Sequence, residues 1–193
     1  MIKVNYKELF RKVITLISSP AKAWEEISLE EDRRAVMSTF VYPMIAFCGL
    51  SMFIGTLIGV GWGGSSLQLA MTNCCAVFVA LFGGYFLVSY LTNQCGMRYL
   101  NRPSEPALCQ QFVGYSMVVT FVLDIVTGLF PSFLILQLIF QFYVVYVVWE
   151  GAGRLMKVEE NKRLVYTLSV SVFIIVAPML IRWVFMRLSY LLQ

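Results

Sequence analysis

Five long apolar segments, separated by short polar loops, fill the chain between residues 38 and 185. They cover residues 39–60, 68–92, 111–130, 133–149 and 164–185. A helix needs about 20 mostly apolar residues to cross a bilayer, and none of these segments alternates apolar and polar residues as a barrel strand does. The pattern therefore predicts an all-α, polytopic membrane bundle of five transmembrane helices.

The connection between the third and fourth segments is the shortest one. Residues 128–132 read Gly-Leu-Phe-Pro-Ser, which is a tight turn. We expect the two segments to form an antiparallel hairpin.

Composition supports a membrane protein and excludes an ordinary soluble domain. Of the 193 residues, 59% are hydrophobic and 13% are charged, whereas soluble domains carry roughly 25% charged residues. The mean hydropathy is +0.75.

The basic residues predict the orientation. Of the 15 Lys and Arg residues, only Arg182 and Arg187 fall on the side of the C-terminus. By the positive-inside rule the N-terminus is cytoplasmic and the C-terminus lies on the far side. The chain then divides into a cytoplasmic region (1–38), a transmembrane domain (39–186) and a far-side tail (187–193). The net charge of +4 reflects this topology. Two cytoplasmic loops, 94–110 (with Arg102) and 151–163, carry basic residues that indicate anchors for lipid headgroups and not a nucleic-acid surface.

The N-terminal region predicts two helices. Apolar residues recur at helical spacing in the first, with basic residues between them, as in helices that lie at a membrane interface. In the second predicted helix, Ser19 is suited to the N-cap and Pro20 to the first helical position. The exposed side of this helix is acidic. Two interpretations stay open for residues 1–38: a docking surface for a cytoplasmic protein partner, or helices resting on lipid. The first helix uses apolar Ile2, Tyr6, Leu9, Phe10, Val13, Ile14 and Ile17 and basic Lys3, Lys7, Arg11 and Lys12.

Several chemistries are disfavoured. The chain has no histidine, and it lacks nucleotide-loop, zinc-protease and paired-carboxylate motifs, so we expect no enzyme, cofactor or metal. Five cysteines without a CxxC pair are typical of reduced thiols. Charges near the N-terminus predict that no signal peptide is cleaved. The short cytoplasmic region favours a bacterial inner membrane.

Two short motifs resemble a known family. Residues 19–27 read SPAKAWEEI, with Pro20 and Trp24 in the positions of the opening motif of bacterial Yip proteins, membrane proteins named for interaction with Ypt/Rab GTPases. Gly114 and Tyr115 are similar to the family's Gly-Tyr motif at the start of the third span. The resemblance implies a five-span fold and a membrane role more firmly than a GTPase partner, because the eukaryotic Asp-Leu-Tyr-Gly-Pro stretch is absent.

Small residues recur every four positions in the first two spans. Lipid tails give helices no hydrophobic reason to associate, so close backbone approach over such stripes is a main source of packing energy. We expect the first two spans to pack tightly together, and the alternative is that one stripe pairs across a homodimer. They consist of Ser51, Gly55, Gly59 and Gly63 in the first span and Ala76, Ala80 and Gly84 in the second.

Asp124 is the one acid deep within a predicted span, where an unpaired carboxylate is costly. Thr120, Gln137 and Gln141 are its expected polar neighbours, and Arg182 is the expected ion-pair partner. Two interpretations remain: a satisfied structural seam, or an ion or solute site in which Pro43 and Pro178 break helices. The sequence thus predicts a non-catalytic scaffold or adaptor in membrane organisation or trafficking, with a small transporter or channel as the alternative.

Overall fold

A computed structural model describes residues 5–101 and 103–191, and within them the fold is entirely helical. Four parts of the sequence predictions lie outside the described residues: Ile2 and Lys3 of the expected first helix, Arg102, and the end of the expected tail. The elements are α1 (Tyr6–Ser18), α2 (Pro20–Ser28), the π-helix η1 (Met37–Val41), α3 (Tyr42–Val60), α4 (Gly64–Leu100), α5 (Pro106–Ser116), α6 (Val118–Leu129), the 3-10 turn η2 (Pro131–Phe133), α7 (Leu134–Phe140), α8 (Tyr143–Arg154) and α9 (Glu160–Leu191).

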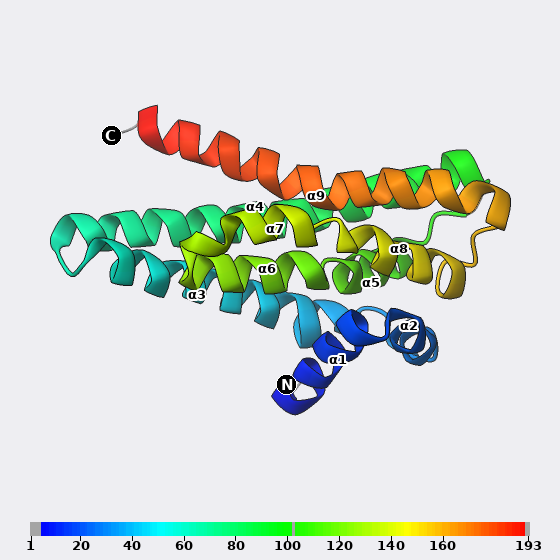
Figure 1. Cartoon of the computed structure of the whole chain (residues 1–193). Helices are drawn as coiled ribbons and strands as arrows, with labels where there is room; N and C mark the ends of the chain where they lie inside the picture. Colours follow the sequence, from blue (N-terminus) through cyan, green and yellow to red (C-terminus); the bar gives the residue numbers. More distant parts are fainter. Residues whose placement is uncertain (1–4, 102, 192–193) are drawn as a thin grey trace.

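The long helices form an elongated bundle (Figure 1). The chain runs along the bundle in α3, returns in α4, runs back in α5 and α6, returns in α7 and α8, and runs back once more in α9. In the bundle α4 packs against α3 and α9, and α3 also packs against α6. The N-terminal helices α1 and α2 lie beside the bundle, with α2 nearer the end where α8 gives way to α9, and α2 packs on α8.

Three helical stretches are long and apolar enough to cross a membrane: Met37–Val60, Gly64–Leu100 and Glu160–Leu191. They contain the first, second and fifth predicted segments. The α5–α6 pair makes a fourth if its 40° bend is included in one span. The structure therefore supports a helical membrane protein with three or four candidate spans among the described residues.

The fourth predicted segment, 133–149, is not a continuous helix. It divides into η2, α7 and α8, with Gln141 and Phe142 between the two α-helices. The backbone N–H groups of Phe142, Val144 and Val145 each bond to a carbonyl three residues earlier, so the helix tightens here. The expectation of one unbroken helix was wrong, because mean hydropathy does not register a change of hydrogen-bond pattern.

The two intramembrane prolines differ in their effect. Pro43 lies in the first turn of α3, where a missing N–H is tolerated, directly after the π-helix η1. Pro178 lies inside α9, which continues through it to Leu191. Pro178 therefore does not break α9 into two helices.

The first two spans pack against each other as expected, in α3 and α4, and small residues also allow close approach to other helices. A Cβ atom on Gly55 would overlap the carbonyl oxygen of Gly128, so the first stripe also meets α6. On the second stripe, a Cβ on Gly84 would lie 2.7 Å from Pro178 Cγ in α9, and Ala80 is buried. A Cβ on Gly59 would have no described neighbour within 4 Å, and a Cβ on Gly63 would meet only Ser66 Oγ, at 3.7 Å. The homodimer stays a prediction.

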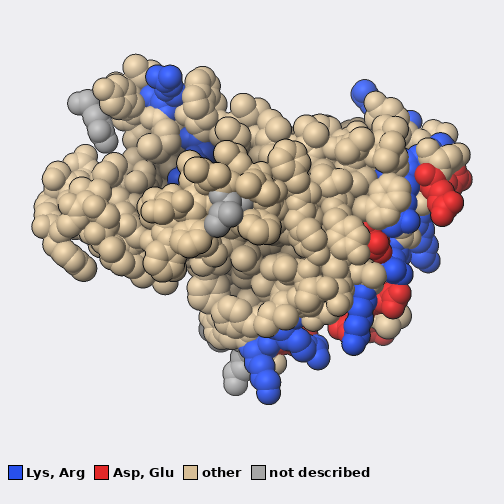
Figure 2. Space-filling view, viewed as in Figure 1, with Lys and Arg blue, Asp and Glu red and all other residues tan. Residues whose placement is uncertain are grey.

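Charged side chains gather at one end of the molecule. Figure 2 shows most red and blue atoms over the end formed by α1, α2 and the α8–α9 connection, while the rest of this face is mainly tan. The apolar core lies beneath that charged end and extends into the bundle. Its largest fully buried side chains include Trp24, Phe40, Tyr85, Phe112, Tyr115 and Phe121.

Candidate functional site

Trp24 fixes the N-terminal helices to the bundle. Its side chain is 0% exposed, and its indole N–H donates a 2.9 Å hydrogen bond to the carbonyl oxygen of Val147 in α8. The ring contacts Phe112 at a centroid distance of 5.5 Å. Gly151 leaves room for it, since a Cβ there would lie 2.6 Å from the indole. Trp24 thus contacts its own chain and is not available to a partner or to lipid.

Two further contacts hold α1 and α2 in place. The Tyr143 hydroxyl in α8 donates to the carbonyl oxygen of Ile17 at 2.7 Å. Arg154 at the end of α8 pairs with Glu25 in α2 at 2.7 Å, although Glu25 is largely exposed and contributes little. Contacts from both N-terminal helices therefore converge on α8.

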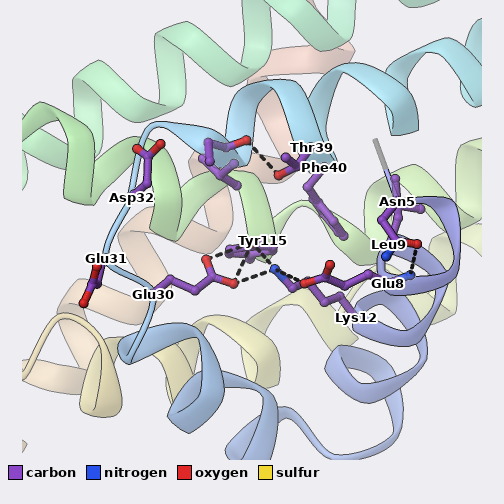
Figure 3. Close-up of a pocket in the computed structure, with 12 residues that line it drawn as sticks. Asn5, Glu8, Leu9, Lys12, Glu30, Glu31, Asp32, Thr39, Phe40 and Tyr115 are labelled. Carbon is purple, nitrogen blue, oxygen red and sulfur yellow. Dashed lines mark hydrogen bonds and ion pairs between the residues drawn. The ribbon is translucent and has the colours of Figure 1, made fainter. Parts of the chain in front are cut away.

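A partly buried polar cluster joins α1, the segment after α2, and α5 (Figure 3). Lys12 Nζ lies 2.5 Å from Glu30 Oε1, and these side chains are 24% and 25% exposed. Tyr115 donates its hydroxyl hydrogen to Glu30 at 3.0 Å and accepts a 3.1 Å hydrogen bond from Lys12. Gln111 Nε2 donates to Glu30 Oε2 at 3.1 Å. Glu30 therefore receives hydrogen bonds from three different side chains.

Tyr115 of the Gly-Tyr motif is thus a member of this cluster. Gly114 of the same motif allows α5 to pack closely against η1. A Cβ on Gly114 would lie 2.9 Å from Val41 Cγ2, so α5 can approach the start of the first span only with glycine here. The Tyr115 ring packs on Phe40 at a centroid distance of 4.8 Å. Both motif residues therefore connect α5 to η1.

The cluster borders a cavity of about 320 Å³ that opens beside α1. Glu8, Glu31 and Asp32 add acidic groups to its rim, as Figure 3 shows. In the described ranges no group of three His, Cys, Asp or Glu side chains is placed to hold a metal ion.

A second cavity, of about 460 Å³, lies inside the membrane domain. Residues of α4, α6, α7 and α9 line it together with the break between α7 and α8. All five residues of the predicted polar cluster line it: Thr120, Asp124, Gln137, Gln141 and Arg182. The structure therefore brings together polar groups that lie up to 62 positions apart in the chain, from Thr120 to Arg182.

The expected direct ion pair between Asp124 and Arg182 is absent from the described structure. Asp124 Oδ1 instead accepts a 3.0 Å hydrogen bond from Gln137 Nε2. Arg182 lines the same cavity, but the hydrogen bond from its guanidinium goes to Met52 Sδ at 3.9 Å, a weak acceptor. The expectation of a direct pair was wrong because each group has a different hydrogen-bond partner.

Buried residues follow the cavity lining towards the charged end of the molecule. One helical turn beyond its lining residues lie Tyr85, Met117, Val144 and Ser171, and all four are buried. Part of the lining is exposed and apolar, at Leu134, Leu138, Phe142 and Met179, so the cavity opens beside these residues.

Sequence reasoning found the intramembrane cluster but missed the one at the charged end. Helical spacing alone places Lys12 among the basic residues of the first helix and Glu30 among the acidic residues that follow Trp24, and it does not pair them. A signal was present: Gln111 opens an apolar span, where an amide needs a partner.

The fold and both cavities define a class: a helical membrane protein whose N-terminal helices are fixed to one end of a transmembrane bundle. Residues 14–181 match the family model of the Yip1 domain, and the chain therefore belongs to the Yip1 domain family. The match includes both motifs that resemble the family, at residues 19–27 and 114–115. Comparisons with curated proteins and with solved structures found no match.

Proposed function

We propose that this protein is a non-catalytic scaffold or adaptor in membrane organisation or trafficking, which presents a rigid surface to a cytoplasmic partner. The observation that carries the proposal is the fixation of α1 and α2 by Trp24. A helix pair that only rested on lipid would not require a fully buried tryptophan with a hydrogen bond to α8. Fixation lowers the entropy that a partner must overcome on binding.

The surface offered to the partner is the outer side of α2 and the segment after it. Glu26, Glu31 and Asp32 are exposed there, next to Arg33 and Arg34. Adjacent charges of opposite sign favour a partner with a complementary charge pattern, because such patterns determine specificity more than affinity.

The proposed topology has five crossings, with the N-terminus cytoplasmic and the C-terminus on the far side. The basic residues at the end that carries α1 and α2 support this orientation. The broken α7–α8 pair supplies the fourth crossing, since non-helical backbone at membrane depth is tolerated where it borders a protein cavity. Reporter fusions test the orientation: alkaline phosphatase at the C-terminus should be active, and a cytoplasmic fluorescent protein at the N-terminus should fluoresce.

Site-specific photocrosslinking in cells tests the partner. A photoreactive amino acid at Glu26 or Asp32 should give a discrete adduct, and one at the exposed Lys162, at the start of α9, serves as matched control. The adduct should disappear in Trp24→Ala protein that still inserts into the membrane. Identical adducts at Lys162, or adducts unaffected by Trp24→Ala, would contradict the proposal.

A second candidate function, transport of a small solute or ion, is favoured by the cavity at Asp124. It requires an opening on both sides, and the buried layer around Tyr85, Met117 and Val144 must then move. Asp124→Asn separates the candidates: lost flux in reconstituted vesicles with intact photocrosslinking favours transport, and unchanged flux favours the scaffold.

A further inference from the structure

We propose that the intramembrane cavity binds the headgroup of a phospholipid that carries both an ammonium and a phosphate, as phosphatidylethanolamine does. The inference concerns a site separate from the proposed partner surface. It is based on the two unpaired charges in the cavity, an unpartnered hydroxyl, and the apolar opening.

The charges of the cavity match a zwitterion. Asp124 and Arg182 carry opposite charges and line the same space without forming an ion pair. A lone cation would be repelled by Arg182, and a lone anion by Asp124. A ligand with both charges satisfies both groups and leaves the cavity neutral, which matters because desolvated charges are costly in a membrane.

Arg182 is the group that would hold the phosphate. Its planar guanidinium offers five N–H donors, and the hydrogen bond it makes is to the thioether of Met52. Guanidinium groups bind phosphate oxygens through two parallel hydrogen bonds, which a thioether cannot replace. Within the described chain, Arg182 therefore has donors available for a bound anion.

The opposite side of the cavity suits a primary ammonium. Asp124 accepts one hydrogen bond from Gln137, which leaves further acceptor positions on its carboxylate. The Gln141 side chain also lines the cavity. Thr120 is 4% exposed, and its hydroxyl has no hydrogen-bond partner among the described residues. An ammonium can donate to three such oxygens at once, whereas a quaternary choline group donates none.

The opening of the cavity indicates a lipid and not a free solute. Leu134, Leu138 and Met179 line it and are 60%, 64% and 71% exposed, so they form part of the surface that faces hydrocarbon. A headgroup that enters sideways leaves its acyl chains on these residues. The volume of about 460 Å³ falls within the roughly 300–1,000 Å³ of small-molecule sites.

Native mass spectrometry of the full-length protein in detergent tests the proposal. The probes are dioleoyl phosphatidylethanolamine, the matching phosphatidylcholine and phosphatidylglycerol, and soluble phosphoethanolamine. We expect the ethanolamine lipid to bind about tenfold more tightly than each of the others. Arg182→Gln should weaken its binding about tenfold, and Asp124→Asn should remove the preference for ethanolamine over glycerol. Arg187→Gln, an exposed cation on the same helix, is the matched control and should change nothing.

Two further variants cover the case in which Asp124→Asn does not fold. Thr120→Val and Gln141→Leu should each lower the preference for ethanolamine over choline while the protein stays folded. Equal binding of all three lipids, or equal losses in Arg187→Gln and Arg182→Gln, would overturn the proposal, because annular lipid alone would explain them. Equally tight binding of soluble phosphoethanolamine would overturn the choice of a lipid.

Discussion

Replacing Trp24 with alanine should release α2 from the bundle. The side chain is fully buried between α2, α5 and α8, and its removal deletes the hydrogen bond to Val147 and leaves a cavity above Gly151. Truncation of a buried tryptophan costs about 3–5 kcal/mol. This corresponds to a shift of roughly a hundredfold to several thousandfold in the equilibrium between docked and released α2.

A spin-label distance measures that equilibrium directly. Labels at Lys22 in α2 and Asn161 in α9, both exposed, should give one narrow distance distribution in the wild-type protein. In Trp24→Ala the distribution should broaden, with released α2 as a major population. Trp24→Phe keeps a ring against Phe112 but loses the indole N–H, which costs about 1 kcal/mol, so it should remain narrow.

One result would refute this reasoning. If Trp24→Ala keeps the narrow distribution in a lipid bilayer, other contacts suffice to hold α2, and the tryptophan does not fix the surface. Gly151→Ala is the complementary change, because its Cβ would lie 2.6 Å from the indole. It should broaden the distribution while Trp24 is still present.

Two further predictions concern packing and polar contacts. Gly55→Ala should destabilise the protein in detergent by at least about 2 kcal/mol, because the new Cβ overlaps the Gly128 carbonyl. Gly59→Ala is the control: its Cβ would have nothing within 4 Å, so the free energy of unfolding should change by no more than about 0.5 kcal/mol. Equal shifts of the thermal unfolding temperature in the two variants would contradict the α3–α6 packing. Tyr115→Phe and Glu30→Gln should each cost about 1–2 kcal/mol, and a double-mutant cycle should show non-additivity of at least about 0.5 kcal/mol. Additive effects would mean that the two side chains do not share one network.

The sequence was sufficient to predict the parts of the fold that follow from hydropathy alone. All-helical structure and membrane-spanning length in α3, α4 and α9 follow from long apolar runs, which leave the backbone in lipid no alternative to internal hydrogen bonds. The start of α2 at Pro20 follows from the preference of proline for the first helical turn, although Ser19 makes no side-chain cap bond. The Yip resemblance rested on two short motifs and is confirmed by the family match.

The parts that could not be predicted depend on which helices become neighbours. The stripe that contains Gly55 could face any helix, and it faces Gly128 because α6 lies in that position. The different hydrogen-bond partners of Asp124 and Arg182 depend on how α6, α7, α3 and α9 pack, which no spacing along the chain encodes. Glu30 finds Lys12, Gln111 and Tyr115 only after α1 and α2 fold back on the bundle. Periodicity gives the face of a helix but not its partner.

The break in the fourth segment and the polar cluster explain each other. α7 ends at Phe140, and Ala80 of α4 lines the same cavity as the residues around this break. Irregular backbone at membrane depth is tolerated where it borders a cavity within the protein, and such backbone favours polar neighbours. Gln141 at the break and Gln137 one turn earlier supply them beside Asp124. The irregular segment therefore places two amides beside the carboxylate, in the site that we assign to a lipid headgroup.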